Sequence, residues 1–308
     1  DNKALAELDV QSLLQMRTLP ERLVNLPLLQ LQRHTGRLRS APGKLQLSAY
    51  SNKSVDPLIG SGGHGHTFPG ATTPFGMVLA TPWAHGSDAW DSQSGFHASP
   101  KEPQLKFYGM AHSGLSGAGT GEMGELRLLP LGGAKQQSFL HVDSVKGSPG
   151  YFLGFASPTS SDAAHCRVQL ESTATPRGAM HRFTFPEAKG LGCEGWEGRF
   201  VRLALDGFGT EGFWGYQLKQ YSLSAIGDKQ LEGCAVSQNE GMGGADGLLC
   251  FAITFDAPFK LNKEESPELL SSSPLLEFAK DTSSLTARVG VSRFDLEHAR
   301  ATLQRELG

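Results

Sequence analysis

The chain has 308 residues and a net charge of −3, with its acidic and basic residues interspersed. This charge pattern argues against a nucleic-acid partner, and the absence of a run of about 18 apolar residues argues against a membrane span. The 38 glycines and 17 prolines are too many for a helical bundle and are typical of a turn-rich β architecture. We therefore expect one large all-β domain or two smaller ones.

Residues 1–50 differ in composition from the rest of the chain. Leu5, Leu8 and Leu13 are spaced for a short amphipathic helix, and residues 33–44 are basic with few apolar side chains. We interpret this region as an N-terminal arm, partly helical, that packs on a partner or on the main domain. The alternative is a poorly ordered leader.

The cysteines and the first residue bear on the cellular compartment. The chain begins with Asp1 rather than methionine, so either a targeting segment has been removed or the sequence is a fragment. Its four cysteines contain no CxxC pair, which argues against a zinc knuckle. Two disulfides would indicate a secreted, periplasmic or secretory-lumen protein, whereas four buried free thiols would fit the cytosol. The four are Cys166, Cys193, Cys234 and Cys250.

The stretch from Val55 to Gly76, VDPLIGSGGHGHTFPGATTPFG, concentrates unusual chemistry. Glycines flank His64 and His66, so the backbone can turn sharply there, and prolines stiffen the remainder. We expect a rigid, irregular loop that presents polar groups for binding or catalysis. The alternative is a tight connection whose histidines only bond local backbone carbonyls.

The next segments alternate between expected strands and polar loops. Residues 76–80 form a short apolar strand, and residues 89–97, AWDSQSGFH, gather polar and aromatic groups. An aromatic strand around residues 107–108 leads into a second glycine-rich loop at residues 109–124 and a strand at 126–131. The two glycine loops and the segment between them are predicted to line one cleft.

The remainder to residue 292 indicates a large antiparallel β-sandwich, which we delimit as residues 51–292. Within Ala179–Phe185, alternation places His181 and Phe183 on one face. The expected strands are Tyr151–Phe155, Cys166–Ser172, Ala179–Phe185, Phe200–Leu205, Gln220–Ile226, Leu248–Phe255 and Leu285–Ser292.

Residues 293–308 change to a helical period. Leu296, Ala299, Leu303 and Leu307 fall on one face. This apolar stripe suggests a linker helix that packs against something further along the protein. The alternative is a terminal helix that docks on the sandwich itself.

Six segments, taken together and in order, resemble the N-terminal half of glycoside hydrolase family 92, from about Val55 to Leu303. They are VDPLIGSGGHGHTFPGATTPFGMV, WDSQSGFH, HSGLSGAGTGEMGE, SPGYF, ESTATPRGAMHRFTFP and ARVGVSRFDLEHARATL. The first motif is long and idiosyncratic, which makes a chance match improbable.

The resemblance implies a calcium-dependent, inverting exo-α-mannosidase, in which an N-terminal β-sandwich is joined by helices to a C-terminal (α/α)6 barrel. In that family the general acid, the general base and most calcium ligands lie in the barrel. Inversion needs two carboxyl groups roughly 6.5–9.5 Å apart, and no segment here matches the family's pair. We therefore expect no catalytic residue and no metal ligand in this chain, which alone should not be a competent hydrolase.

The resemblance also implies residues that contact a mannose-containing glycan. Trp90 could stack on a sugar face or be a core tryptophan, and Asp91 could accept sugar hydroxyls or cap a turn. His64 could bind sugar or be a satisfied loop histidine. The full set of substrate-binding candidates is Gly62, Gly63, His64, His66, Trp90, Asp91 and His112.

The second loop departs from the family pattern, which usually resembles SHTHLSGTGCSDYGD. Gly114 replaces a histidine, Thr120 replaces a cysteine, and Glu122 and Glu125 replace aspartates. Residues 92–93 also replace a small residue followed by cysteine. Loss of an imidazole removes a donor, which indicates either lost mannose recognition or a divergent specificity.

Three functional hypotheses follow. The leading one is the sandwich half of an α-mannosidase that works with a barrel domain or a partner chain. The second is a non-catalytic structural subunit of a larger assembly. The third is a free-standing carbohydrate-binding module.

Overall fold

The computed structural model describes residues 46–49, 55–85, 94–98, 105–114, 116, 124–133, 137–158, 166–187, 193, 196, 198–205, 216–239, 246–262 and 273–308. These residues form fifteen strands and one helix, α2 (Leu296–Leu307). The expected N-terminal helix lies outside the described residues. The strands are β1 (Gln46–Ala49), β2 (Thr81–His85), β3 (Leu105–Ala111), β4 (Arg127–Leu131), β5 (Leu140–Ser148), β6 (Tyr151–Ser157), β7 (Val168–Ala174), β8 (Gly178–Thr184), β9 (Phe200–Ala204), β10 (Tyr216–Ile226), β11 (Gln230–Asn239), β12 (Asp246–Phe255), β13 (Phe259–Asn262), β14 (Leu275–Phe278) and β15 (Ser284–Ser292).

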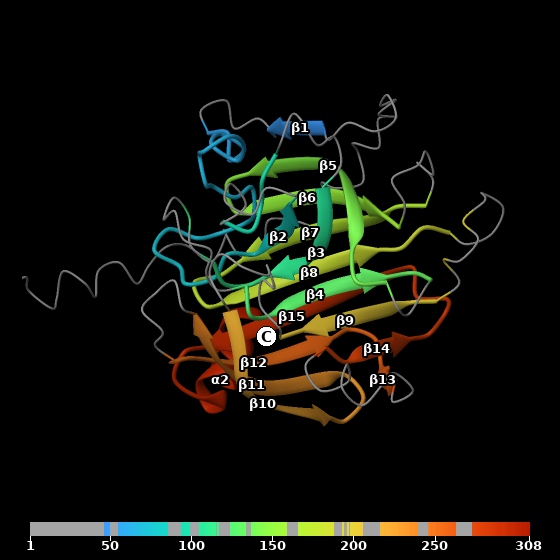
Figure 1. Ribbon diagram of the computed structural model, residues 1–308. Coiled ribbons are helices and arrows are strands. Elements are labelled where there is room, and N and C mark those ends of the chain that lie inside the picture. Colours follow the sequence, from blue (N-terminus) through green and yellow to red (C-terminus); the bar gives the residue numbers. More distant parts are fainter. Residues whose placement is uncertain are drawn as a thin grey trace, which may run out of the picture. The chain divides into compact units, whose positions relative to one another are not determined.

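Hydrogen bonding joins the strands into one curled sheet (Figure 1). Its order is β10-β11-β12-β15-β8-β7-β6-β5-β3-β4-β9-β14-β13, and every neighbouring pair on this path is antiparallel. β1 pairs with β5 in parallel, and β2 pairs with β3. The predicted antiparallel β fold is confirmed. The described strands form a single bonded path rather than the two separate sheets of the predicted sandwich.

Period-two alternation explains why the middle strands were predictable. In β8, His181 and Phe183 are buried, whereas Met180, Arg182 and Thr184 are partly exposed. This confirms the predicted alternation. The buried face belongs to a large core of aromatic and aliphatic side chains drawn from almost every described strand.

The predicted strand at residues 76–80 is wrong. This segment makes only an isolated bridge between Ala71 and Ala80, and β2 begins at Thr81. The amide of Met77 donates to the Pro176 carbonyl (2.7 Å), and the amide of Leu79 donates to the His112 carbonyl (3.3 Å). The segment therefore bonds to two different loops instead of to one partner strand.

Helix α2 packs on the sheet through the predicted stripe. Ala299, Leu303 and Leu307 are buried with Ala252 of β12 and Cys250. The stripe is therefore covered by this chain's own sheet, as the docking alternative predicted. Figure 1 shows α2 beside the β11 and β12 end of the sheet.

Two local features fix α2 in place. Asp295 caps its N-terminus, since the Asp295 carboxylate accepts a hydrogen bond from the His298 amide (2.8 Å). On the sheet, a Cβ at Gly290 would lie 2.6 Å from the Ala299 carbonyl oxygen, so only glycine allows the helix this close. Within the described residues no helix is long and apolar enough to cross a membrane.

Candidate functional site

The first glycine loop folds tightly upon itself. The amide of Thr67 donates to the Gly60 carbonyl (3.2 Å), and the amide of Gly65 donates to that of Gly62 (3.3 Å). A Cβ at Gly65 would lie only 2.1 Å from the Gly60 oxygen, so this position accepts glycine alone. The prediction of a compact irregular loop is confirmed, because its shape depends on its own backbone.

The predicted binding residues of this loop differ in their exposure to solvent. His64 is exposed and Gly63 beside it is also exposed, whereas Gly62 and His66 are partly buried. His66 has a φ of 53°, a left-handed conformation that is uncommon outside glycine. His64 is therefore exposed, two residues before a backbone position held in this uncommon conformation.

The segment after Trp90 and Asp91 anchors this loop. The amide of Ala98 donates to the Ser61 carbonyl (2.7 Å), and the hydroxyl of Ser94 donates to the Thr67 carbonyl (2.9 Å). Trp90 and Asp91 themselves lie outside the described residues. The structure nonetheless brings the end of their segment directly against the first glycine loop.

Trp83 of β2 packs against two of the three predicted loop segments, residues 89–97 and the second glycine loop, and the sequence analysis did not single it out. Its indole is 1% exposed and faces Gly95, Gly114 and Gly124. A Cβ at Gly95 would lie 2.3 Å from the indole and one at Gly124 would lie 2.8 Å away. The available signal was a second tryptophan, in addition to Trp90, between the two glycine-rich loops. The described parts of these two segments thus share one buried support.

His112, near the start of the second glycine loop, is buried at 1% exposure. Its Nδ1 lies 2.9 Å from the Leu126 carbonyl and its Nε2 lies 2.8 Å from Nε2 of His181. The Nδ1 of His181 is in turn 2.7 Å from the hydroxyl of Ser172. Because a carbonyl only accepts, His112 donates from Nδ1, His181 donates from Nε2 and Ser172 donates to His181.

This arrangement requires both rings to be neutral. Burial lowers the pKa of His112 to about 4. Burial, followed by the neighbouring His112, lowers the pKa of His181 well below its usual value. Both ring nitrogens of His112 are engaged, so the sugar contact predicted for it would require this network to rearrange.

Glu125 ends the second glycine loop and connects it to the start of α2. The Ser113 hydroxyl donates to its carboxylate, and Arg293 donates to the other carboxylate oxygen (2.8 Å). The Ser113 hydroxyl also accepts from the Gly124 amide (3.2 Å). This buried, charge-assisted network holds the end of the loop.

Arginines hold each of the buried carboxylates in the described part of the chain. Glu125 pairs with Arg293, Glu171 with Arg182, and Glu232 with Arg300. No group of three His, Cys, Asp or Glu side chains among the described residues is placed to hold a metal ion. Calcium needs six to eight oxygen ligands, so these arginine-paired carboxylates do not suit it.

All four cysteines form disulfides. Cys166 bonds to Cys193, and Cys234 bonds to Cys250 across β11 and β12. Of the two alternatives left open by the sequence, the disulfide interpretation is confirmed. Such bonds persist in oxidising compartments.

Comparisons with known proteins agree with the predicted resemblance. The family described as "Glycosyl hydrolase family 92 N-terminal domain" matches residues 54–292. An "Uncharacterized secreted glycosidase" of Arthroderma benhamiae is 30% identical over 145 residues, which are 43% of this chain and 17% of that protein.

Two solved structures share the fold. A GH92 α-mannosidase from Bacteroides thetaiotaomicron, in complex with mannoimidazole, superposes with a TM-score of 0.65 at 20% identity. The match covers 82% of this chain but only 34% of the mannosidase chain. An inverting GH92 mannosidase from the same organism has a TM-score of 0.57 at 17% identity, covering 84% and 34%. The chain therefore spans about a third of these relatives, and by its family match it belongs to glycosyl hydrolase family 92 as an N-terminal domain.

Proposed function

We propose that this chain is the N-terminal half of an α-mannosidase-like glycoside hydrolase. It lines the mannose pocket, and a separate (α/α)6 barrel domain or chain supplies catalysis and most calcium ligands. The observation that carries the proposal is the coverage: the family domain occupies residues 54–292, yet the chain accounts for 34% of a solved family member. The arginine pairing of its buried carboxylates supports the same division, because such pairing disfavours a general acid.

The pocket rim in this proposal is the first glycine loop and its neighbour. Gly62 and Gly63 let the backbone approach the sugar, and His64 and His66 offer imidazole donors. Trp90 and Asp91 are proposed as the stacking and hydroxyl-binding partners. The bonds from Ala98 and Ser94 to this loop support their placement beside it.

His112 acts from below in this proposal. Its carbonyl accepts the Leu79 amide, and its ring bonds to His181. It therefore joins the start of the second glycine loop to residues 77–80 and to β8. A direct bond from His112 to sugar remains a prediction.

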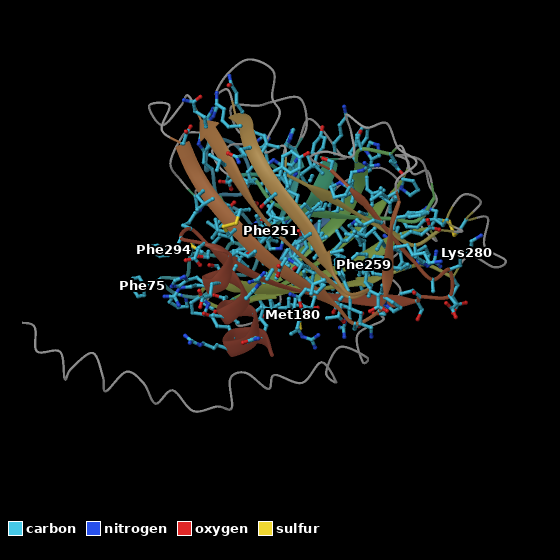
Figure 2. All side chains as sticks on the ribbon, turned by 90° about the horizontal axis from the view of Figure 1, so that it is seen from below. Phe75, Met180, Phe251, Phe259, Lys280 and Phe294 are labelled. Carbon is cyan, nitrogen blue, oxygen red and sulfur yellow. A yellow bond between two sulfur atoms is a disulfide. The ribbon has the colours of Figure 1, made fainter. Side chains whose placement is uncertain are left out.

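The barrel would cover exposed apolar residues near the start of α2. Phe75 is fully exposed and Phe294 is 79% exposed, with Met77 also exposed. Met77 and Val291 bond to the adjacent residues Pro176 and Arg177, so both segments meet at one turn. Figure 2 shows Phe75 and Phe294 projecting on the same side. Exposed apolar patches of this kind mark interaction sites.

A binding measurement tests this docking. The chain is mixed with the separately produced barrel domain or partner chain, and the affinity is measured by calorimetry. We expect F75S/F294S to weaken binding at least tenfold, because truncating exposed aromatic anchors removes hot-spot contacts. The control is I226S, which changes an exposed isoleucine at the end of β10. Equal losses in both variants would contradict this docking surface.

The proposal also places the protein in a secreted, periplasmic or secretory-lumen compartment. The two disulfides support an oxidising environment. The related fungal protein is described as secreted. Growth in a host without disulfide formation should then yield reduced and less stable protein.

A non-catalytic structural subunit is the second candidate, favoured by Gly114 in place of a histidine. Mannose and α-mannobiose calorimetry on the assembled complex separates the two. Saturable heat supports the glycosidase half, and its absence together with tight partner binding supports the structural subunit. Saturable heat with the isolated chain would instead support a carbohydrate-binding module.

A further inference from the structure

A groove of about 370 Å³ lies between α2 and the sheet, away from the glycine loops. Gln230, Thr254 and Arg288 contribute from the sheet, and Arg300, Leu303 and Gln304 contribute from the helix. No segment assigned to the sugar pocket contributes to it. The groove is therefore a separate feature of the molecule.

The three sheet residues lie in one row. Gln230 of β11 pairs with Thr254 of β12, and Thr254 pairs with Arg288 of β15. Residues opposite one another on neighbouring strands point to the same face. Two residues along, Gly290 lies directly under α2, so this polar row faces the same side as the helix.

Two arginines line the groove. Arg300 is held by the buried Glu232: its Nε donates to one carboxylate oxygen (2.8 Å) and its Nη2 donates to the other. Hydrogen bonding to Arg300 lowers the pKa of Glu232, and the same bonds raise the pKa of Arg300. Three of the five N–H groups of Arg300 are left for another acceptor.

Arg288 supplies the second guanidinium. It is partly buried, and among the described residues it has neither an ion pair nor a side-chain hydrogen bond. No carboxylate side chain lines the groove, but its lining includes Gly308, which carries the terminal carboxylate of the 308-residue chain. A half-buried guanidinium without an acceptor, next to a second one in a fixed orientation, is suited to bind an anion.

We propose that this groove is a binding site for a small organic anion. A carboxylate or phosphate group accepts from Arg288, Arg300 and the Thr254 hydroxyl. The apolar part of the ligand lies on Leu303 and Leu307. The site is independent of the mannose pocket, and its failure would leave that proposal untouched.

The test follows the arginine Nε–Hε resonances of the 308-residue chain by NMR during titration with inorganic phosphate or with acetate. Ionic strength is held constant with sodium chloride, because weak surface electrostatics are screened by salt. We expect the Arg288 and Arg300 signals to shift together and to saturate with one dissociation constant in the millimolar range. Saturation with only one of the two anions identifies the ligand class.

Three variants make the test specific. R288Q should weaken binding about tenfold or more, because it removes a charge-assisted donor. T254V keeps the shape of the strand and should weaken binding a few-fold. It tests the proposal in place of R288Q if R288Q does not fold. R305Q is the matched control, since Arg305 is exposed on the same helix and does not line the groove. Linear shifts with both anions, or equal affinity in R288Q and R305Q, would overturn the proposal.

Discussion

Replacing individual glycines around Trp83 by alanine should distinguish the glycines that leave no room for a Cβ against the indole from the glycine that has room for one. Gly95, Gly114 and Gly124 all face the same buried indole. At Gly95 the φ is 87° and an added Cβ would lie 2.3 Å from Cε3 of Trp83. At Gly114 the backbone is not left-handed, and an added Cβ would lie 3.4 Å from Leu79 and 3.7 Å from Trp83.

The structure sets the expected magnitudes. Alanine in the left-handed region costs about 1–2 kcal/mol, and overpacking a core costs about 1–3 kcal/mol. G95A should therefore lower the free energy of unfolding by about 2–5 kcal/mol. G114A meets only ordinary contacts, so it should be neutral or stabilising by about 0.4–1 kcal/mol through the unfolded state.

Urea unfolding followed by tryptophan fluorescence measures both variants, with near-ultraviolet circular dichroism to report the Trp83 environment. G124A is a second close-approach variant, with a φ of 73° and a Cβ 2.8 Å from the indole. It should resemble G95A. If G114A lost as much stability as G95A, the inference that Trp83 supports these segments by close packing would be refuted.

Three further predictions concern stability. Lowering the pH from 6.5 towards 4 should reduce the free energy of unfolding by about 3 kcal/mol through His112. The pKa of His112 in the folded chain is about 4, so the unfolded chain binds the proton first as the pH falls. A plot of the urea midpoint against pH should have a smaller slope in H112L than in the unchanged chain, and the same slope in H64A. R300M should weaken the docking of α2, since it removes the arginine paired with Glu232 and leaves this carboxylate with only the Gln230 amide. Hydrogen exchange at the α2 amides should rise, and unchanged protection would refute this. The disulfides join cysteines 27 and 16 residues apart. Reducing each one should lower the free energy of unfolding by about 3–4 kcal/mol. Thiol labelling before reduction should detect no free cysteine.

The sequence predicted those parts of the fold that depend on local periodicity. Alternation in β8 and the apolar stripe of α2 each follow from spacing alone, and both are confirmed. Residues 76–80 have the composition of a strand, but the segment bonds to two loops. Composition therefore identified an extended apolar run and could not tell which partner would pair with it.

The sequence identified the segments that form the site, but not which of their residues contact one another. His112 was identified from its motif, yet its partner His181 is 69 residues away and belongs to another strand. Similarly, the role of Trp83 depends on glycines from two distant loops. Register across a sheet of fifteen strands fixes these contacts, and no local pattern encodes that register.

The most direct test of the central claim is the rate of hydrolysis of an aryl α-mannoside. The 308-residue chain is assayed alone and then with its barrel domain or partner chain, in the presence of calcium. We predict no release above the blank from the chain alone and turnover from the assembled protein. Hydrolysis by the isolated chain at a rate comparable to full-length family members would contradict the account, because the catalytic carboxylates would then lie within it.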